Sequence, residues 1–146
     1  MTYLLDTCVI SEYVRKKPNT HVIQWIDDQD ESKLFLSVLT IGELKKGIIK
    51  IENNNPTRYE KLLKWLKTIE NRFSGRVLSI GSQTISIWAE CCGISEAKGT
   101  KLPIIDSLLS ATAQEHALTI VTRNVDDFRF FSANTFNPWE IQDLPE

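Results

Sequence analysis

Five acidic or amide side chains stand where an apolar strand or the start of a helix meets a turn: Asp6, Glu43, Asp106, Asn124 and Asp127. In open α/β sheets, groups at the carboxyl ends of the strands share one crevice. We therefore predict one acidic pocket assembled by folding. Clustered carboxylates repel one another, and a divalent cation relieves that repulsion. Mg²⁺ or Mn²⁺ suits such hard oxygen donors best.

Several of these residues also have a purely structural interpretation. Asp6 follows an apolar strand and precedes a helix, where a carboxylate can act as an N-cap. Glu43 ends the sequence Thr40-Ile41-Gly42-Glu43, which fits a capping box. Asn124 and Asp127 can form a turn. Taken singly, none of these positions establishes a function.

Asp106 is harder to explain by structure alone. It is the only charged residue from Leu102 to Gln114, in a helical pattern that is otherwise largely apolar. An acid in the first turn can complement the helix dipole. A buried carboxylate without a partner nevertheless costs several kcal/mol unless it is protonated, hydrogen-bonded or bound to a cation. The pattern therefore favours a ligating role for Asp106.

Elements of alternating type must position these side chains. Apolar runs predict strands, with a plausible edge strand at the end, at residues 3–5, 34–36, 77–80, 119–122 and 135–136. Helical spacing predicts the helices between them, at residues 9–14, 20–27, 40–52, 57–73, 82–98 and 103–117. Strands that alternate with helices indicate an α/β fold of three layers. Its central sheet is mostly parallel, with four to five strands and helices on both faces.

The chain has 146 residues, which predicts one domain over residues 1–146. Its uninterrupted apolar runs are far shorter than the ~18 residues of a membrane helix, and its start lacks the features of a secretory signal. We therefore expect no membrane contact and a cytoplasmic location. Cys8, Cys91 and Cys92 form an odd set, which fits reduced thiols better than a disulfide framework.

Basic residues gather in three places although the net charge is only −2. The clusters are Arg15 to Lys17, Lys45 with Lys46 and Lys50, and Lys61 with Lys64 and Lys67. Each can bind nucleic-acid phosphates or can simply form a solvated helix face.

Four segments, in their order and spacing, resemble the PIN-domain nucleases over essentially the whole chain. They are Leu4 to Glu12, Thr40 to Leu44, Pro103 to Asp106 and Thr119 to Asn124. Within that family the chain is most similar to the VapC-type toxins of bacterial toxin–antitoxin pairs. The closing Phe136-Asn137-Pro138-Trp139 resembles their FitB-like branch.

The resemblance implies an acidic triad of Asp6, Glu43 and Asp106, with Asp6 and Asp106 holding the metal. Asn124 stands where many members carry a fourth acid, and Asp127 is expected to supply that carboxylate. Cys8 stands where the family usually has asparagine. The implied function is a Mg²⁺- or Mn²⁺-dependent endoribonuclease toxin that hydrolyses RNA, with tRNA among the candidate substrates.

The resemblance also implies a cognate antitoxin and a homodimer. We expect the antitoxin tail to occupy a hydrophobic groove among the first four helices. One alternative is a catalytically weakened module that binds a partner or nucleic acid, because Cys8 and Asn124 depart from the family pattern. A phospho-acceptor signalling domain is disfavoured, since no second acid stands beside Asp6.

Overall fold

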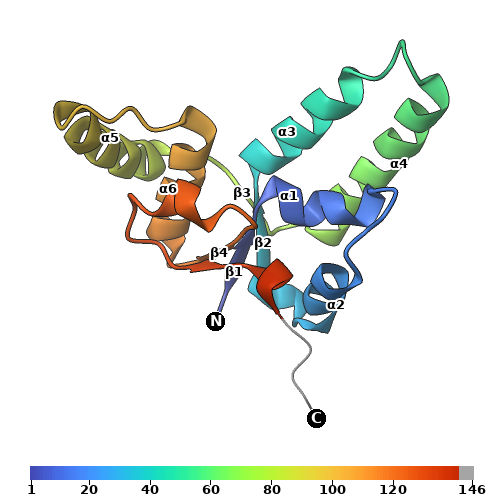
Figure 1. The fold of residues 1–146 in the computed structure, drawn as a ribbon, viewed down its shortest axis with the longest axis horizontal. Helices are drawn as coiled ribbons and strands as arrows, with labels where there is room; N and C mark the ends of the chain where they lie inside the picture. Colours follow the sequence, from blue (N-terminus) through green and yellow to red (C-terminus); the bar gives the residue numbers. More distant parts are fainter. Residues whose placement is uncertain (142–146) are drawn as a thin grey trace.

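The centre of the fold is a five-stranded parallel sheet, seen in a computed structural model that describes residues 1–141 (Figure 1). The strand order is β3-β2-β1-β4-β5, and each strand pair in the described part of the chain is parallel. The predicted α/β fold class is confirmed. The strands are β1 (Tyr3–Leu5), β2 (Leu34–Ser37), β3 (Val77–Leu78), β4 (Thr119–Val121) and β5 (Thr135–Phe136).

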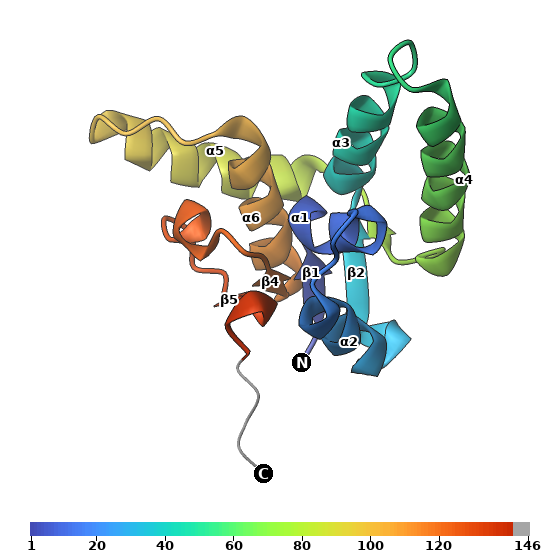
Figure 2. The same ribbon diagram turned by 45° about the vertical axis from the view of Figure 1, so that its right-hand side comes forward.

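Helices cover both faces of this sheet. Figures 1 and 2 show α1 to α4 on one side of the sheet and α5 with α6 on the other. The α-helices are α1 (Thr7–Ile10), α2 (Thr20–Asp28), α3 (Val38–Ile49), α4 (Pro56–Arg72), α5 (Ser82–Ala97) and α6 (Ile104–His116). The short 3-10 helices are η1 (Ser11–Val14), η2 (Glu31–Lys33), η3 (Val125–Phe128) and η4 (Pro138–Glu140).

Side chains that point alternately to opposite faces of the central strands produce these layers. Leu5 and Val121 point to the face covered by α1 to α4, where they join one buried cluster. Leu4 and Ile120, each one residue earlier, join a second buried cluster with Leu109 of α6. Successive side chains of a strand lie on opposite faces. The two central strands are therefore buried on both sides, as their continuous apolar runs predict.

Several predicted helix boundaries were wrong because other residues occupy the N-cap positions. Helix α3 begins at Val38 rather than Thr40, since Ser37 accepts the Leu39 N–H at 3.1 Å. Asn19, rather than Thr20, caps α2. Asn55 caps α4, and Gly81, rather than Ser82, occupies the N-cap of α5.

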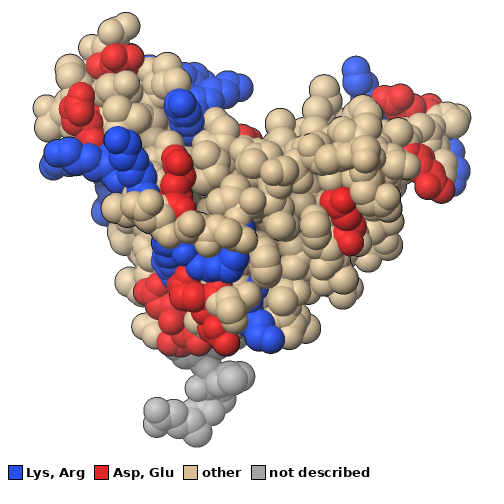
Figure 3. Space-filling model, turned by 180° about the vertical axis from the view of Figure 1, so that it is seen from behind, with Lys and Arg blue, Asp and Glu red and all other residues tan. Residues whose placement is uncertain are grey.

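The carboxyl ends of β1 and β4 form the topological switch point of the sheet. From β1 the chain moves outward to β2 and β3, then returns to the other side of β1 with β4 and β5. Such a reversal opens a crevice that α/β proteins use for ligands. Seen from behind, the surface is hollowed between two lobes, built by the α3–α4 hairpin and by α5 (Figure 3). Within residues 1–141, no helix is both long and apolar enough to cross a membrane.

Candidate active site

Asp6 lies at the carboxyl end of β1, and both of its carboxylate oxygens are hydrogen-bonded. Oδ1 accepts the Thr7 N–H at 2.8 Å, so the predicted N-cap of α1 is confirmed. Oδ2 accepts the Thr122 hydroxyl at 2.8 Å and faces the Cys8 thiol at 3.6 Å. Asp6 therefore caps α1 with Oδ1, while Oδ2 binds Thr122, the residue that follows β4.

Thr122 is the residue that joins the two strand ends. Its side chain is fully buried, and its hydroxyl oxygen accepts the Asn124 N–H at 3.0 Å while it donates to Asp6. The Asp6 N–H also donates to the Val121 carbonyl at 3.0 Å. These bonds hold the end of β1 against the end of β4, and they fix the orientation of the Asp6 carboxylate.

Glu43 has no part in a capping box. Because α3 begins at Val38, Glu43 stands in the second turn of that helix, and its carboxylate accepts the Thr7 hydroxyl at 2.7 Å. Thr40, the expected cap, has a buried hydroxyl with no hydrogen-bond partner in the described part of the chain. The capping-box interpretation was wrong. Thr7 instead links two of the predicted acids, through its N–H to Asp6 and its hydroxyl to Glu43.

Asp106 lies half-buried in the first turn of α6 and interacts electrostatically with the other acids. Burial is the main reason why the pKa of Asp106 is raised from 3.8 to about 6. The negative charges of Asp6, Asp127 and Glu43 raise this pKa further, in that order. The charges of three acids, at the end of β1, in α3 and in η3, therefore act on Asp106 at the start of α6. That these acids form one catalytic pocket stays a prediction.

The start of α6 is more open than the sequence suggested. Ile104 and Ile105 are 59% and 38% exposed, whereas Ser107 and Leu109 are buried. The expectation that this helix is buried on most faces holds only after its first turn. Asp106 therefore stands at the boundary between core and solvent, where its carboxylate is partly desolvated and still accessible.

Asn124 and Asp127 have different roles in the geometry. Asn124 occupies the N-cap position of η3, and its backbone N–H donates to Thr122. Its exposed side chain has no hydrogen-bond partner within residues 1–141. Asp127, also exposed, is the member of the pair whose charge acts on Asp106.

Cys8 is a neutral thiol in this site. Burial, followed by the negative charge of Asp6, raises its pKa to about 11. Its sulfur lies 3.8 Å from the Thr122 hydroxyl and 3.6 Å from Asp6 Oδ2, so it can donate a weak hydrogen bond to the carboxylate. The prediction of a small, half-buried thiol is confirmed.

The donor chemistry of the site fits a hard divalent cation. Carboxylate oxygens suit Mg²⁺ and Mn²⁺, and a cation would offset the negative charges of Asp6, Asp127 and Glu43 that act on Asp106. In the described part of the chain, however, no three His, Cys, Asp or Glu side chains are grouped closely enough to hold an ion as they stand. Bound water, which Mg²⁺ usually keeps, must therefore complete any coordination shell here.

Two residues that bond to the candidate acids were not identified from the sequence, Thr7 and Thr122. Thr7 directly follows the first acid, and Thr122 ends the run that was expected to be the fourth strand. A hydroxyl beside an acid was a signal that could have suggested Thr7. The bond between Asp6 and Thr122 spans 116 positions and follows only from the pairing of β1 with β4.

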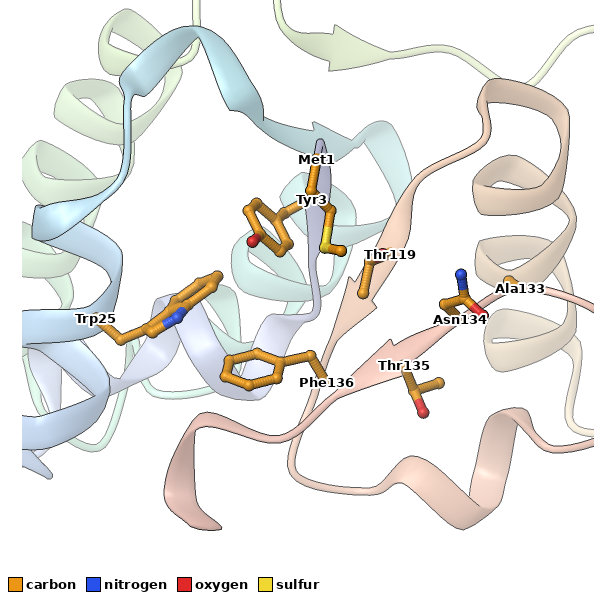
Figure 4. Close-up of a pocket in the computed structure, with 8 residues that line it drawn as sticks. All are labelled: Met1, Tyr3, Trp25, Thr119, Ala133, Asn134, Thr135 and Phe136. Atoms are coloured by element: carbon orange, nitrogen blue, oxygen red, sulfur yellow. The ribbon is translucent and has the colours of Figure 1, made fainter. Parts of the chain in front are cut away.

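A separate pocket of about 680 Å³ lies at the amino ends of β1, β4 and β5 (Figure 4). Tyr3, Trp25 and Phe136 supply its aromatic wall, with ring centroids 5.0 Å apart in each neighbouring pair. Among residues 1–141, no Asp, Glu, Lys or Arg side chain lines it. It lies at the opposite end of β1 from Asp6, so it is not part of the acidic site.

Comparison with known proteins places these observations in a family. The PIN domain family model matches residues 3–132. The plasmid stability protein StbB of Pseudomonas syringae pv. tomato is 37% identical over 94% of this chain and 98% of its own length. The toxin FitB of Neisseria gonorrhoeae is 33% identical over 93% and 97%. The VapC ribonuclease Y4jK of Sinorhizobium fredii is 29% identical over 94% and 97%.

Solved structures support the same assignment. The crystal structure of FitAcB from Neisseria gonorrhoeae contains a chain with a TM-score of 0.89 and 32% identity, and the match covers 96% of this chain and 100% of that one. A structure of FitAB bound to an IR36 DNA fragment matches with a TM-score of 0.79 and 30% identity, over 97% and 99%.

Proposed function

The chain belongs to the PIN domain family, and on that premise we propose that it is a metal-dependent endoribonuclease that acts as the toxin of a toxin–antitoxin pair. One observation carries the proposal. Asp6, Glu43 and Asp127 all act on Asp106 and raise its pKa, although they come from distant parts of the sequence. Perturbed carboxylates in a crevice are typical of catalytic sites. The names of the relatives, a toxin and a ribonuclease, support the same activity.

Asp6 and Asp106 are the proposed ligands of Mg²⁺ or Mn²⁺. When bound, the cation supplies Lewis-acid polarisation of the scissile phosphate and lowers the pKa of water. Glu43, Asp127 and the amide of Asn124 complete the proposed catalytic set.

The residues of the chain itself have distinct tasks in this proposal. Thr122 and the Thr7 N–H orient Asp6, and the Thr7 hydroxyl orients Glu43. Orientation of this kind lowers the entropic part of the barrier, because the reacting groups are held before the substrate arrives. The exposed Lys45 and Lys46 of α3, close after Glu43 in the sequence, bind the RNA backbone.

The proposed partner is a cognate antitoxin. This rests on the relative named toxin FitB and on the structure of FitAB bound to DNA. We place the antitoxin tail in a hydrophobic groove among α1 to α4, and we infer a homodimer in the cytoplasm. Residues 1–146 are proposed to act as a single domain.

The test is cleavage of labelled total tRNA and single-stranded RNA by the purified protein in Mn²⁺, Mg²⁺ and EDTA. We expect cleavage only with the metal, and its loss in an Asp6→Asn/Asp106→Asn double variant. Asp126→Asn is the matched control. Asp126 is an exposed acid beside Asp127, but the charge of Asp126 is not among those that act on Asp106. Cleavage that persists in EDTA or in the double variant would refute the assignment of the site.

A binding module without catalysis is the second candidate. It is favoured by the neutral residues Cys8 and Asn124, and by the lack of a closed three-ligand group within residues 1–141. Folded, antitoxin-free protein that cleaves none of the RNAs in any metal, yet captures a protein partner, would select this alternative.

A further inference from the structure

Arg123 connects the acidic site with the chain after β5. It follows Thr122, whose hydroxyl donates to Asp6, and precedes Asn124. Thr122 also lies 3.8 Å from the Cys8 sulfur through its hydroxyl oxygen. The main chain of Arg123 therefore lies at the wall of the crevice, and its side chain leaves from that wall.

The Arg123 side chain is held over an aromatic ring. Its guanidinium carbon lies 5.4 Å from the centroid of Trp139 in η4. Asn137 binds both residues, because its amide donates to the Arg123 carbonyl at 3.3 Å and its side-chain oxygen accepts the Trp139 N–H at 2.9 Å. The η4 segment packs in turn against α2 (Figure 1). The arginine is therefore preorganised by its stacking partner and its main chain.

The charge of Arg123 is not used within the described part of the chain. Arg15, Arg72 and Arg76 all form ion pairs with glutamates. Arg123 is exposed and makes no ion pair and no side-chain hydrogen bond among residues 1–141. An arginine stacked by its face keeps its N–H edges directed outward, and those edges match the geometry of a phosphate.

RNA is a polyanion, so its binding beside the acids requires a cationic side chain such as that of Arg123. The charged groups that act on Asp106 are all acids, so the crevice repels RNA before any metal binds. Lys45 and Lys46 lie on α3, close after Glu43, whereas Arg123 follows β4 on the other side of β1. Cations on both sides can hold a strand across the acids by its phosphates.

We propose that Arg123, positioned by Trp139, is a phosphate-binding residue that holds the RNA backbone on the β4 side of the acidic site. This inference rests on the proposed ribonuclease function and adds a specific subsite to it. It is a binding role, distinct from the catalytic role given to the acids.

The test measures RNA binding separately from cleavage. Fluorescence anisotropy with a labelled single-stranded RNA in EDTA gives the affinity at several salt concentrations. Loss of one phosphate contact lowers the slope of log K against log salt by about 0.7 for single strands. We expect Arg123→Ala to show this smaller slope and about tenfold weaker binding. Arg123→Lys should keep the slope and lose part of the affinity.

The matched control is Arg129→Ala. Arg129 is exposed and stacks on Phe130, with the guanidinium carbon 5.0 Å from the ring centroid, but it follows η3 in the sequence instead of β4. Trp139→Phe should bind RNA nearly as well as the original protein. Trp139→Leu should weaken binding at a temperature where both variants are fully folded, a condition that is needed because Trp139 also packs against the core. That difference separates positioning of Arg123 from support of the fold.

The outcomes separate the two proposals. An Arg123→Ala protein with the original slope, or a slope equal to that of Arg129→Ala, would overturn this inference while leaving the nuclease proposal in place. Conversely, an Arg123-dependent slope in a protein that cleaves no RNA would support the subsite and reject the nuclease.

Discussion

Replacing Asp106 with asparagine is expected to stabilise the metal-free protein above pH 6. The four converging carboxylates repel one another, and Asp106 carries the largest part of that cost. Its pKa is raised to about 6 by burial and then by the charges of Asp6, Asp127 and Glu43. Asparagine keeps the shape and removes one of the repelling charges. A stability gain from a change at the active site is typical of a site built for function.

The magnitude follows from the shifted titration. When a carboxyl group whose pKa rises from 3.8 to about 6 on folding is fully ionised, it lowers the free energy of unfolding by about 3 kcal/mol if no solvent screening applies. Asp106 is only half-buried, so solvent screening reduces the expected effect to about 1 kcal/mol. For a chain of this length, that corresponds to a rise in Tm of about 4 °C.

The upward direction of the Asp106 pKa shift sets the pH range in which the two proteins differ in stability. Between pH 4 and 6 the folded state binds more protons at Asp106 than the unfolded state does, so the original protein loses stability as the pH rises through this range. The advantage of Asp106→Asn is therefore fully present above pH 6 and absent below pH 4. Mg²⁺ or Mn²⁺ should stabilise the original protein and reverse the order, because a ligand that binds only the folded state raises its stability.

Thermal unfolding in EDTA, followed by circular dichroism from pH 4 to 8, measures this difference. Asp126→Asn is the control and should change the Tm little at any pH. An Asp106→Asn protein that is less stable than the original at pH 7.5, or equally more stable at pH 4 and pH 7.5, would refute the idea that the acids repel one another through Asp106.

Three further predictions concern residues that hold the site and the core. Thr122→Val should lower the cleavage rate, and it should lower the stability by about 1–3 kcal/mol because the buried bonds of the hydroxyl to Asp6 and to the Asn124 N–H are lost. Thr122→Ser keeps the hydroxyl, so it should retain both properties in cleavage assays and denaturant unfolding. Thr7→Val should reduce kcat more than KM, since only the orientation of Glu43 changes, and steady-state kinetics on a short RNA would show it. Phe73→Ala, at a fully buried position away from the acids, should cost about 3–5 kcal/mol in urea unfolding.

The sequence determined the elements and the identity of the candidate acids. Apolar runs alternating with helical spacing specify an α/β chain, because each pattern is local to a few residues. Asp6 was recognisable as a candidate because it directly follows a buried strand, although the same position also suits the N-cap of α1, a role that it fills. Asp106 was recognisable because a single charge in an apolar helix is costly. These inferences need no knowledge of which strands are neighbours.

Helix starts were only partly determined by the sequence. Ser37 and Thr40 are both good caps and lie three positions apart. The choice fell on Ser37 because β2 ends there, so the chain turns into α3 at that residue. That choice decided the role of Glu43, which lies in the second turn and bonds to Thr7 instead of to its own helix start.

The arrangement of the acids was decided by the tertiary structure. The order β3-β2-β1-β4-β5 brings Thr122 to Asp6, and it brings Arg123 to the same crevice. Hydrogen bonds and charge interactions act over a few ångströms, whereas these residues are separated by more than a hundred positions. The residue types were therefore readable from the chain. Their mutual bonds and the raised pKa of Asp106 arise only when the strands pair.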